Sequence, residues 1–210
     1  MSSSEGPERE CALEADTYAT EGMVPALTYT LPASGWASLN RTVARGNFHL
    51  FPPGGSMSGF DEGTTDAITV LSAVVPPGVC TGQPSEKFAS TFRGLMHFMR
   101  GNPHVVLSNI RNASVGGLKG MAMDVAYADD DGCPDGDYTD LMVGVDPSHG
   151  AVGVTPSTRG LRAILLHVPG SDLPMAILID DARNGGSDYG DGEPWLDAAE
   201  GVIDTFVITP

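Results

Sequence analysis

The sequence predicts an α+β fold, in which a mostly antiparallel sheet of about seven or eight strands is covered by two main helices. Short apolar runs, many of them β-branched, recur between clusters of Gly and Pro. Several runs are joined by connections too short for a crossover helix, which favours antiparallel pairing. Only two segments carry apolar residues at helical spacing, and each single apolar stripe must pack on a sheet.

Eight segments have the pattern of strands. They are residues 26–32, 47–55, 66–75, 104–110, 121–128, 140–145, 161–168 and 174–180. The second is expected to return beside the first, with residues 33–36 as the turn and Trp36 in the core. The C-terminal residues 205–210 are expected to add a short edge strand.

Two helices are expected. The first spans residues 85–101, with Ser85 as N-cap, Gly101 after the last turn and His97 on the solvent side. Its apolar stripe consists of Phe88, Phe92, Leu95, Met96 and Met99. The second helix begins at Pro194, where a missing N–H costs nothing. Its apolar stripe consists of Trp195, Leu196, Ala199, Val202, Ile203 and Phe206.

Length and composition indicate one folded domain. The chain has 210 residues, of which 41% are hydrophobic, and this is enough for a core. Gly and Pro together (27 and 16 residues) stay below the roughly 25–30% typical of low-complexity disorder. We expect a flexible acidic tail over residues 1–20 and a single globular domain over residues 21–210.

Charge excludes several classes of partner. Lys+Arg is 11 and Asp+Glu is 27, so the net charge is -16. Nucleic-acid binding needs clustered Lys and Arg, and adsorption on anionic lipid needs a basic surface. No apolar run approaches 18 residues, so the chain is not expected to insert into a membrane. Nucleotide-binding, zinc and nucleophile-elbow motifs are absent from the sequence.

The cysteines bear on the cellular compartment. Cys80 and Cys133 both lie in loop sequences flanked by Gly and Pro, which favours a Cys80–Cys133 disulfide and an oxidising compartment. The alternative is two unrelated thiols. Cys11 is left over and either pairs with a partner or stays free. The polar N-terminus is typical of a tether that follows a removed export signal or of a cytosolic protein, and we favour the first.

An acidic loop is the one candidate metal site. Its carboxylates Asp129, Asp131, Asp135 and Asp137 are hard oxygen ligands that suit weak Ca²⁺ binding. The register of a calcium-binding EF-hand is absent, so a solvated acidic loop is the alternative. No other cofactor is expected.

Three sequence pieces carry a family resemblance. LTYTLPASGW, NFHLFPPGG and PWLDAAEGVIDTFVI resemble small actinobacterial secreted or lipoprotein domains. Those domains are similar to the α/β/α sandwich of the photosystem extrinsic subunit PsbP and a Ran-binding nuclear import factor. The resemblance covers roughly residues 20–210 and implies a binding or scaffolding module. It carries over no catalytic residue.

Two functions remain open. The favoured one is an extracytoplasmic, non-catalytic sensor or binding domain for an unknown protein or a small apolar ligand. The alternative is a small cytosolic, cyclase-like or tailoring enzyme that folds an apolar substrate in a pocket. That pocket would be lined by Phe92, Met96, Met99, Met121, Met123, Tyr127, His167 and Trp195. In the first case the methionines are expected to be packed on all sides.

Overall fold

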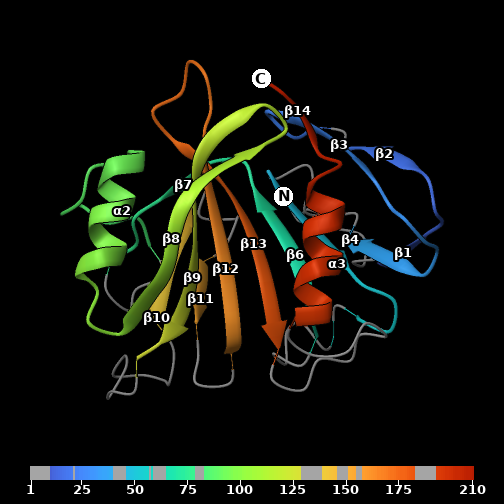
Figure 1. Cartoon of the computed structure of the whole chain (residues 1–210). Helices are drawn as coiled ribbons and strands as arrows, with labels where there is room; N and C mark the ends of the chain where they lie inside the picture. Colours follow the sequence, from blue (N-terminus) through green and yellow to red (C-terminus); the bar gives the residue numbers. More distant parts are fainter. Residues whose placement is uncertain are drawn as a thin grey trace, which may run out of the picture.

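The computed structural model describes residues 10–20, 22–39, 46–56, 58, 65–78, 83–128, 139–145, 151–154, 158–182 and 193–210. Within these residues the chain is mostly β-structure, with one eight-stranded sheet, two three-stranded sheets and two helices (Figure 1). Every strand pair is antiparallel. The antiparallel pairing expected from the short connections is therefore confirmed.

The strands belong to three sheets. The large sheet has the order β1 (Glu10–Leu13), β4 (Trp36–Leu39), β5 (Asn47–Phe51), β6 (Ala67–Leu71), β13 (Pro174–Ala182), β12 (Thr158–His167), β9 (Leu118–Tyr127) and β8 (Val105–Val115). One small sheet consists of β11 (Ala151–Val154), β10 (Thr139–Gly144) and β7 (Val74–Val75). The other consists of β14 (Val207–Thr209), β3 (Ala26–Thr30) and β2 (Thr17–Ala19).

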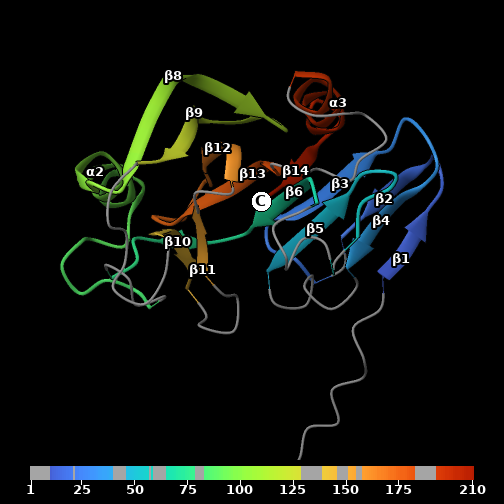
Figure 2. The same cartoon turned by 90° about the horizontal axis from the view of Figure 1, so that it is seen from below.

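The large sheet is buried on both faces at its centre. Alternate side chains of a strand point to opposite faces. On β13, Ile177 and Ile179 enter one core cluster, whereas Ala176 and Leu178 enter another. The first cluster includes α3 (Glu193–Ile203), β3 and β14, and the second includes α2 (Phe92–Gly101) and β10. Figure 2 shows α3 and the pair β10–β11 on opposite sides of the large sheet.

The predicted fold class is wrong. An α/β/α sandwich with two main helices covering the sheet was expected, but the protein is mostly β. The helices have only 10 and 11 residues, and each shares its face of the sheet with a three-stranded sheet. The physical reason is that short extended segments, such as Val74–Val75 and Ala26–Thr30, bury apolar side chains as parts of small sheets.

Helix α2 begins later than expected. Ser85 is not its N-cap and Phe88 lies outside it, because the first helical residue is Phe92. Thr91 caps the helix: its backbone is extended, and its hydroxyl accepts a hydrogen bond from the Gly94 amide at 3.1 Å. Gly101 was expected after the last turn but is the last helical residue, and Asn102 caps the end of the helix. The expectation that His97 lies on the solvent side is confirmed.

The N-terminal third also differs from expectation. The segment 47–55 does not return beside 26–32, because β5 pairs with β4 and β6 while β3 pairs with β2 and β14. Strands β1 and β2 lie within residues 1–20, in the segment expected to be a flexible tail. At the other end, β14 confirms the predicted edge strand.

The two tryptophans anchor the core on the α3 side. Trp36 and Trp195 are both fully buried, and their ring centroids lie 6.2 Å apart. The Trp195 indole donates a hydrogen bond to the backbone carbonyl of Asp180 at 2.9 Å, which ties α3 to the end of β13. The expected core position of Trp36 is confirmed.

Candidate functional site: a polar pocket between the sheet and α3

A row of polar side chains crosses three neighbouring strands beside α3. Ser108 of β8 lies opposite Asp124 of β9, and Asp124 lies opposite Arg162 of β12. Arg162 interrupts the apolar run LRAILLHV, and Asp124 interrupts MAMDVAY. Because register partners on one face of an antiparallel sheet have neighbouring side chains, the three polar groups lie together.

Arg162 and Asp124 form the centre of a hydrogen-bonded network. The Arg162 Nε donates to Asp124 Oδ1 at 2.8 Å, and its Nη1 donates to Glu200 Oε1 of α3 at 2.5 Å. The second oxygen of Asp124 accepts from Asn109 Nδ2 at 2.7 Å. The network therefore links β9 and β12 to both α3 and β8.

A backbone irregularity places Asn109 in this network. The register of β8 against β9 shifts between Ser108 and Arg111, and Asn109 has a φ of 50° in the left-handed region. Asn adopts this conformation more readily than most residues with a side chain. A bulge of this kind redirects a side chain, and here the Asn109 amide reaches across to β9.

Both central charges are held in their ionised forms. Burial on its own raises the pKa of Asp124, but the hydrogen bonds from Arg162 and Asn109 outweigh it and hold that pKa below its usual range. The hydrogen bond to Asp124 raises the pKa of Arg162; burial opposes this, and the hydrogen bond to Glu200 adds to it. Neither group can therefore exchange a proton near neutral pH.

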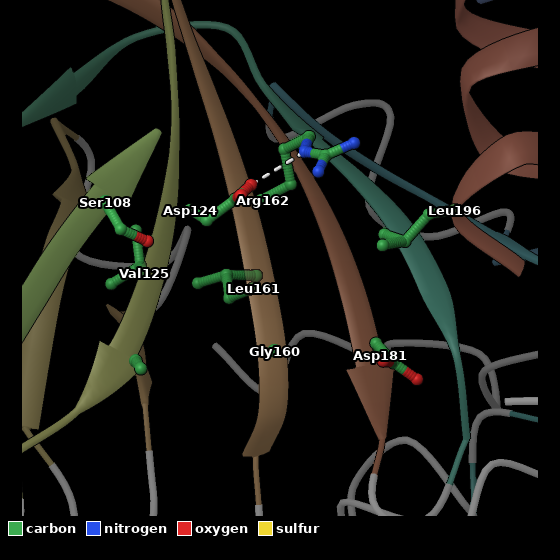
Figure 3. Close-up of a pocket in the computed structure, with 9 residues that line it drawn as sticks. Ser108, Asp124, Val125, Gly160, Leu161, Arg162, Asp181 and Leu196 are labelled. Carbon is green, nitrogen blue, oxygen red and sulfur yellow. Dashed lines mark hydrogen bonds and ion pairs between the residues drawn. The ribbon is translucent and has the colours of Figure 1, made fainter. Parts of the chain in front are cut away.

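A cavity of about 230 Å³ lies against this network (Figure 3). Ser108, Asp124 and Arg162 line one part, and Leu196 of α3 lies on the opposite side. Gly160 and the buried Asp181, which are register partners on β12 and β13, complete it together with Val125, Ala126 and Leu161. The cavity thus combines carboxylate and hydroxyl groups with an apolar wall.

Three carboxyl groups gather beside this cavity, where β6 begins and β13 ends. Burial, followed by the neighbouring charges of Asp66 and Asp181, raises the pKa of Asp180 to about 7. Asp66 and Asp181 are themselves almost completely buried. In the described part of the chain no group of three metal-ligating side chains could hold a metal ion.

The structure places most of the predicted pocket residues in one core cluster. Met99 and Met123 are fully buried there and Met96 nearly so, with Phe92, Met121 and Tyr127 packed against them. The ring of His167 stacks on Phe92 with centroids 4.0 Å apart. Trp195 belongs to the cluster on the other face of the sheet.

Two predicted sites lie outside the described residues. They are the acidic loop with Asp129, Asp131, Asp135 and Asp137, and the pair Cys80 and Cys133. Calcium binding and the disulfide stay predictions.

Sequence reasoning missed the Arg162–Asp124 pair. The available signal was a single charge inside each of two apolar strands, because a charge in such a position needs a partner. Only the strand order identifies that partner.

The chain matches no protein-family model, no curated protein and no solved structure. The resemblance to PsbP-like domains therefore stays a prediction. Within the described residues, no helix has the length and apolar character that a membrane span requires.

Proposed function

We propose that the protein is a non-catalytic binding domain, and that the pocket between the sheet and α3 holds its ligand. The observation that carries this proposal is the paired state of the pocket's charges. Asp124 and Arg162 are fixed by each other and by Asn109 and Glu200, so they can orient a ligand by hydrogen bonding. Since neither titrates near neutral pH, they are poor general acids or bases.

The pocket favours a small ligand with hydrogen-bond donors. Its volume of about 230 Å³ is below the range of about 300–1,000 Å³ for drug-sized ligands. Acceptor groups outnumber donor groups in the polar lining, with Asp124, Asp181 and Ser108 against one guanidinium, two of whose N–H groups donate to Asp124 and Glu200. A small primary amine with an apolar part has the matching chemistry.

The alternative of an enzyme for an apolar substrate has less support. Its expected pocket residues Met99 and Met123 are completely buried among other apolar side chains. One observation favours it, namely the pKa of about 7 at Asp180, which is the range of a general acid or base. Turnover of an amine or an apolar compound that is abolished by Asp180→Asn would favour the enzyme.

The ligand site can be tested by filling it. A Cβ atom at Gly160 would meet only Asp181 Oδ2, at 4.0 Å, so Gly160→Val places a side chain in the pocket without a backbone clash. The control is Gly201→Ala, where a Cβ atom meets nothing within 4 Å. Amide shifts in NMR spectra are recorded while small primary amines, alcohols or carboxylates are added.

The expected result is that amines alone shift the amides of Ser108, Asp124 and Leu161, and that Gly160→Val abolishes the shifts while Gly201→Ala retains them. Equal shifts from carboxylates, or shifts that survive Gly160→Val, would contradict the proposal.

We further propose that the domain works outside the cytoplasm, and the loop setting of Cys80 and Cys133 supports this. A disulfide between them would stabilise the fold by about 3–4 kcal/mol on the chain-entropy model. Mass spectrometry of the oxidised protein under non-reducing conditions is expected to show the Cys80–Cys133 crosslink. Three free thiols in that sample would count against an extracytoplasmic location.

A further inference from the structure

The charges of this chain are unevenly distributed. Residues 87–123 contain no Asp or Glu but hold five basic residues, Lys87, Arg93, Arg100, Arg111 and Lys119. All 27 acidic residues and only six of the 11 basic ones lie elsewhere, so this segment has a charge of +5 and the remainder -21. Such asymmetry indicates a local binding surface for an anionic partner.

Helix α2 lies at one end of the molecule, and the rest of the segment forms the edge strand β8 and the first part of β9, which run from α2 toward β14 (Figure 1). Helix α2 buries Leu95, Met96, Phe98 and Met99 against the core. Its exposed residues Arg93, His97 and Arg100 follow at positions i, i+4 and i+7, so they share the outer side of the helix.

The two arginines on this side of α2 are exposed. Within the described residues Arg93 and Arg100 form no ion pair, whereas Arg111 and Arg162 both pair with Glu200. The Lys87 Nζ lies 5.5 Å from the ring centroid of Phe88, next to the helix. We call the exposed set Lys87, Arg93, His97 and Arg100 the basic ridge.

The basic ridge separates two shallow hollows. One, of about 430 Å³, is lined by Arg93, Met96, His97, Arg100 and Gly101. The other, of about 400 Å³, lies toward Lys87 and Phe88 and shares Arg93 and His97 with the first. Each hollow therefore offers cations together with an apolar side chain, Met96 in one and Phe88 in the other.

We propose that the basic ridge is a docking surface for an acidic segment of another protein, bound in an extended conformation. Seven helical residues span about 10 Å, which is the distance from Arg93 to Arg100 along α2. A peptide in the extended polyproline II form has three residues per turn, so residues three apart lie on the same side and span about 9 Å. Carboxylates three residues apart can therefore meet both arginines, while apolar residues between them enter the hollows.

The charge of the remaining surface favours a short peptide over a larger polyanion. Nucleic acid or an anionic membrane would extend far beyond α2 and meet the part of the chain that carries a charge of -21. Screening limits the attraction of the ridge to about 8 Å at physiological salt. A short acidic segment stays within that distance, so it gains the attraction and avoids most of the repulsion.

The test uses the full chain and a fluorescein-labelled peptide with Glu at every third position, separated by Leu and Ser. Binding is measured by fluorescence anisotropy at low and physiological salt. We expect Arg93→Gln and Arg100→Gln each to weaken binding about threefold, and the double variant about tenfold or more. Lys119→Gln removes the same charge at the far end of the β8–β9 hairpin and is expected to leave affinity within about 1.5-fold.

Several results would overturn the proposal. One is the absence of binding at low salt, and another is equal binding of a peptide with Gln in place of Glu. A third is an equal loss in Lys119→Gln and Arg100→Gln, which would indicate diffuse attraction. Tighter binding of single-stranded DNA or phosphatidylserine vesicles through Arg93 and Arg100 would assign the ridge to another partner class. Ser108 and Asp124 are untouched by these variants, so the pocket proposal is tested separately.

Discussion

The two helices differ in whether the charged side chains around them form ion pairs. Beside α3, Arg162 binds Asp124 at 2.8 Å and Glu200 at 2.5 Å, and Trp195 is anchored to β13. Beside α2, the inner side is apolar and the outer cations Arg93 and Arg100 have no ion-pair partner among the described residues. The two helices are nearly equal in length, with 10 and 11 residues.

Paired and exposed charges contribute differently to a protein. A paired, half-buried charge costs desolvation and repays it by fixing the position of its neighbours. An exposed cation contributes little to stability and remains available to a partner. This contrast supports both proposals, a rigid ligand pocket beside α3 and an electrostatic docking surface on α2.

Trp195→Ala is expected to have the largest effect, because it removes the anchor of α3. The side chain is fully buried and donates its indole hydrogen bond to the Asp180 carbonyl. The free energy of unfolding, measured by urea denaturation, is expected to fall by about 3–5 kcal/mol. Trp195→Phe keeps much of the packing and is expected to cost clearly less. A loss below about 1 kcal/mol for the alanine variant would show that α3 is not anchored by this residue.

Asp180→Asn is expected to stabilise the protein in a pH-dependent way. Below about pH 4 the carboxyl group is protonated in both the folded and unfolded states. Between about pH 4 and 7 the unfolded state ionises first, so the free energy of unfolding falls as pH rises and stays low above pH 7. The gain at pH 8 has an upper limit of about 4 kcal/mol at 1.36 kcal/mol per pKa unit, and it should vanish near pH 3.

The matched control is Asp204→Asn, since this exposed residue of the α3 end changes the net charge equally. Urea denaturation at pH 3, 5 and 8 distinguishes the two variants. A destabilised Asp180→Asn protein at pH 8 would mean that the carboxylate has a structural role.

Arg162→Met tests the paired charges directly. The side chain is 17% exposed, and its loss leaves Asp124 with only Asn109 as a described hydrogen-bond partner. We expect a loss of about 1–3 kcal/mol in the free energy of unfolding. Arg111→Met breaks a 3.6 Å contact between side chains that are 45% and 41% exposed, and should cost less than about 0.5 kcal/mol. An equal loss of stability in the two variants would contradict the difference expected between the half-buried Arg162 pair and the exposed Arg111 pair.

The smallest effect is expected on the other helix. Arg93→Gln and Arg100→Gln should each change the free energy of unfolding by no more than about 0.5 kcal/mol, because neither side chain has an ion pair or hydrogen bond among the described residues. Thermal denaturation followed by circular dichroism checks this. A loss above about 1 kcal/mol would assign these arginines to the fold and remove them from the docking surface.

Much of the secondary structure could be predicted from local pattern, but less of its assembly. The apolar run in residues 174–180 and the Trp195 stripe predicted a strand and a helix correctly. The start of α2 was missed because Thr91 caps the helix in place of Ser85, and both are acceptable N-caps by residue type. The pairing of β3 with β14 was missed because these strands are far apart along the chain.

In the candidate site, too, single residues could be predicted from the sequence but their assembly could not. Arg162 and Asp124 are visible in the sequence as single charges within apolar strands, so a polar function for each could have been suspected. Their mutual contact depends on β9 and β12 being neighbours in register, and their link to α3 depends on Glu200. The pocket exists only because these three elements meet.

The sequence by itself determined where the longer strands lie, that they pair in antiparallel fashion, and where the basic, acid-free segment 87–123 lies. These are properties of local spacing, loop length and composition, which need no knowledge of distant residues. Only the tertiary structure decided which charges are paired and which face outward. That outcome depends on contacts between residues such as Arg162 and Glu200, and 38 positions of sequence separate these two. The mostly β architecture was decided at the same level, because short strands such as β2 and β7 form only when a partner strand is brought beside them.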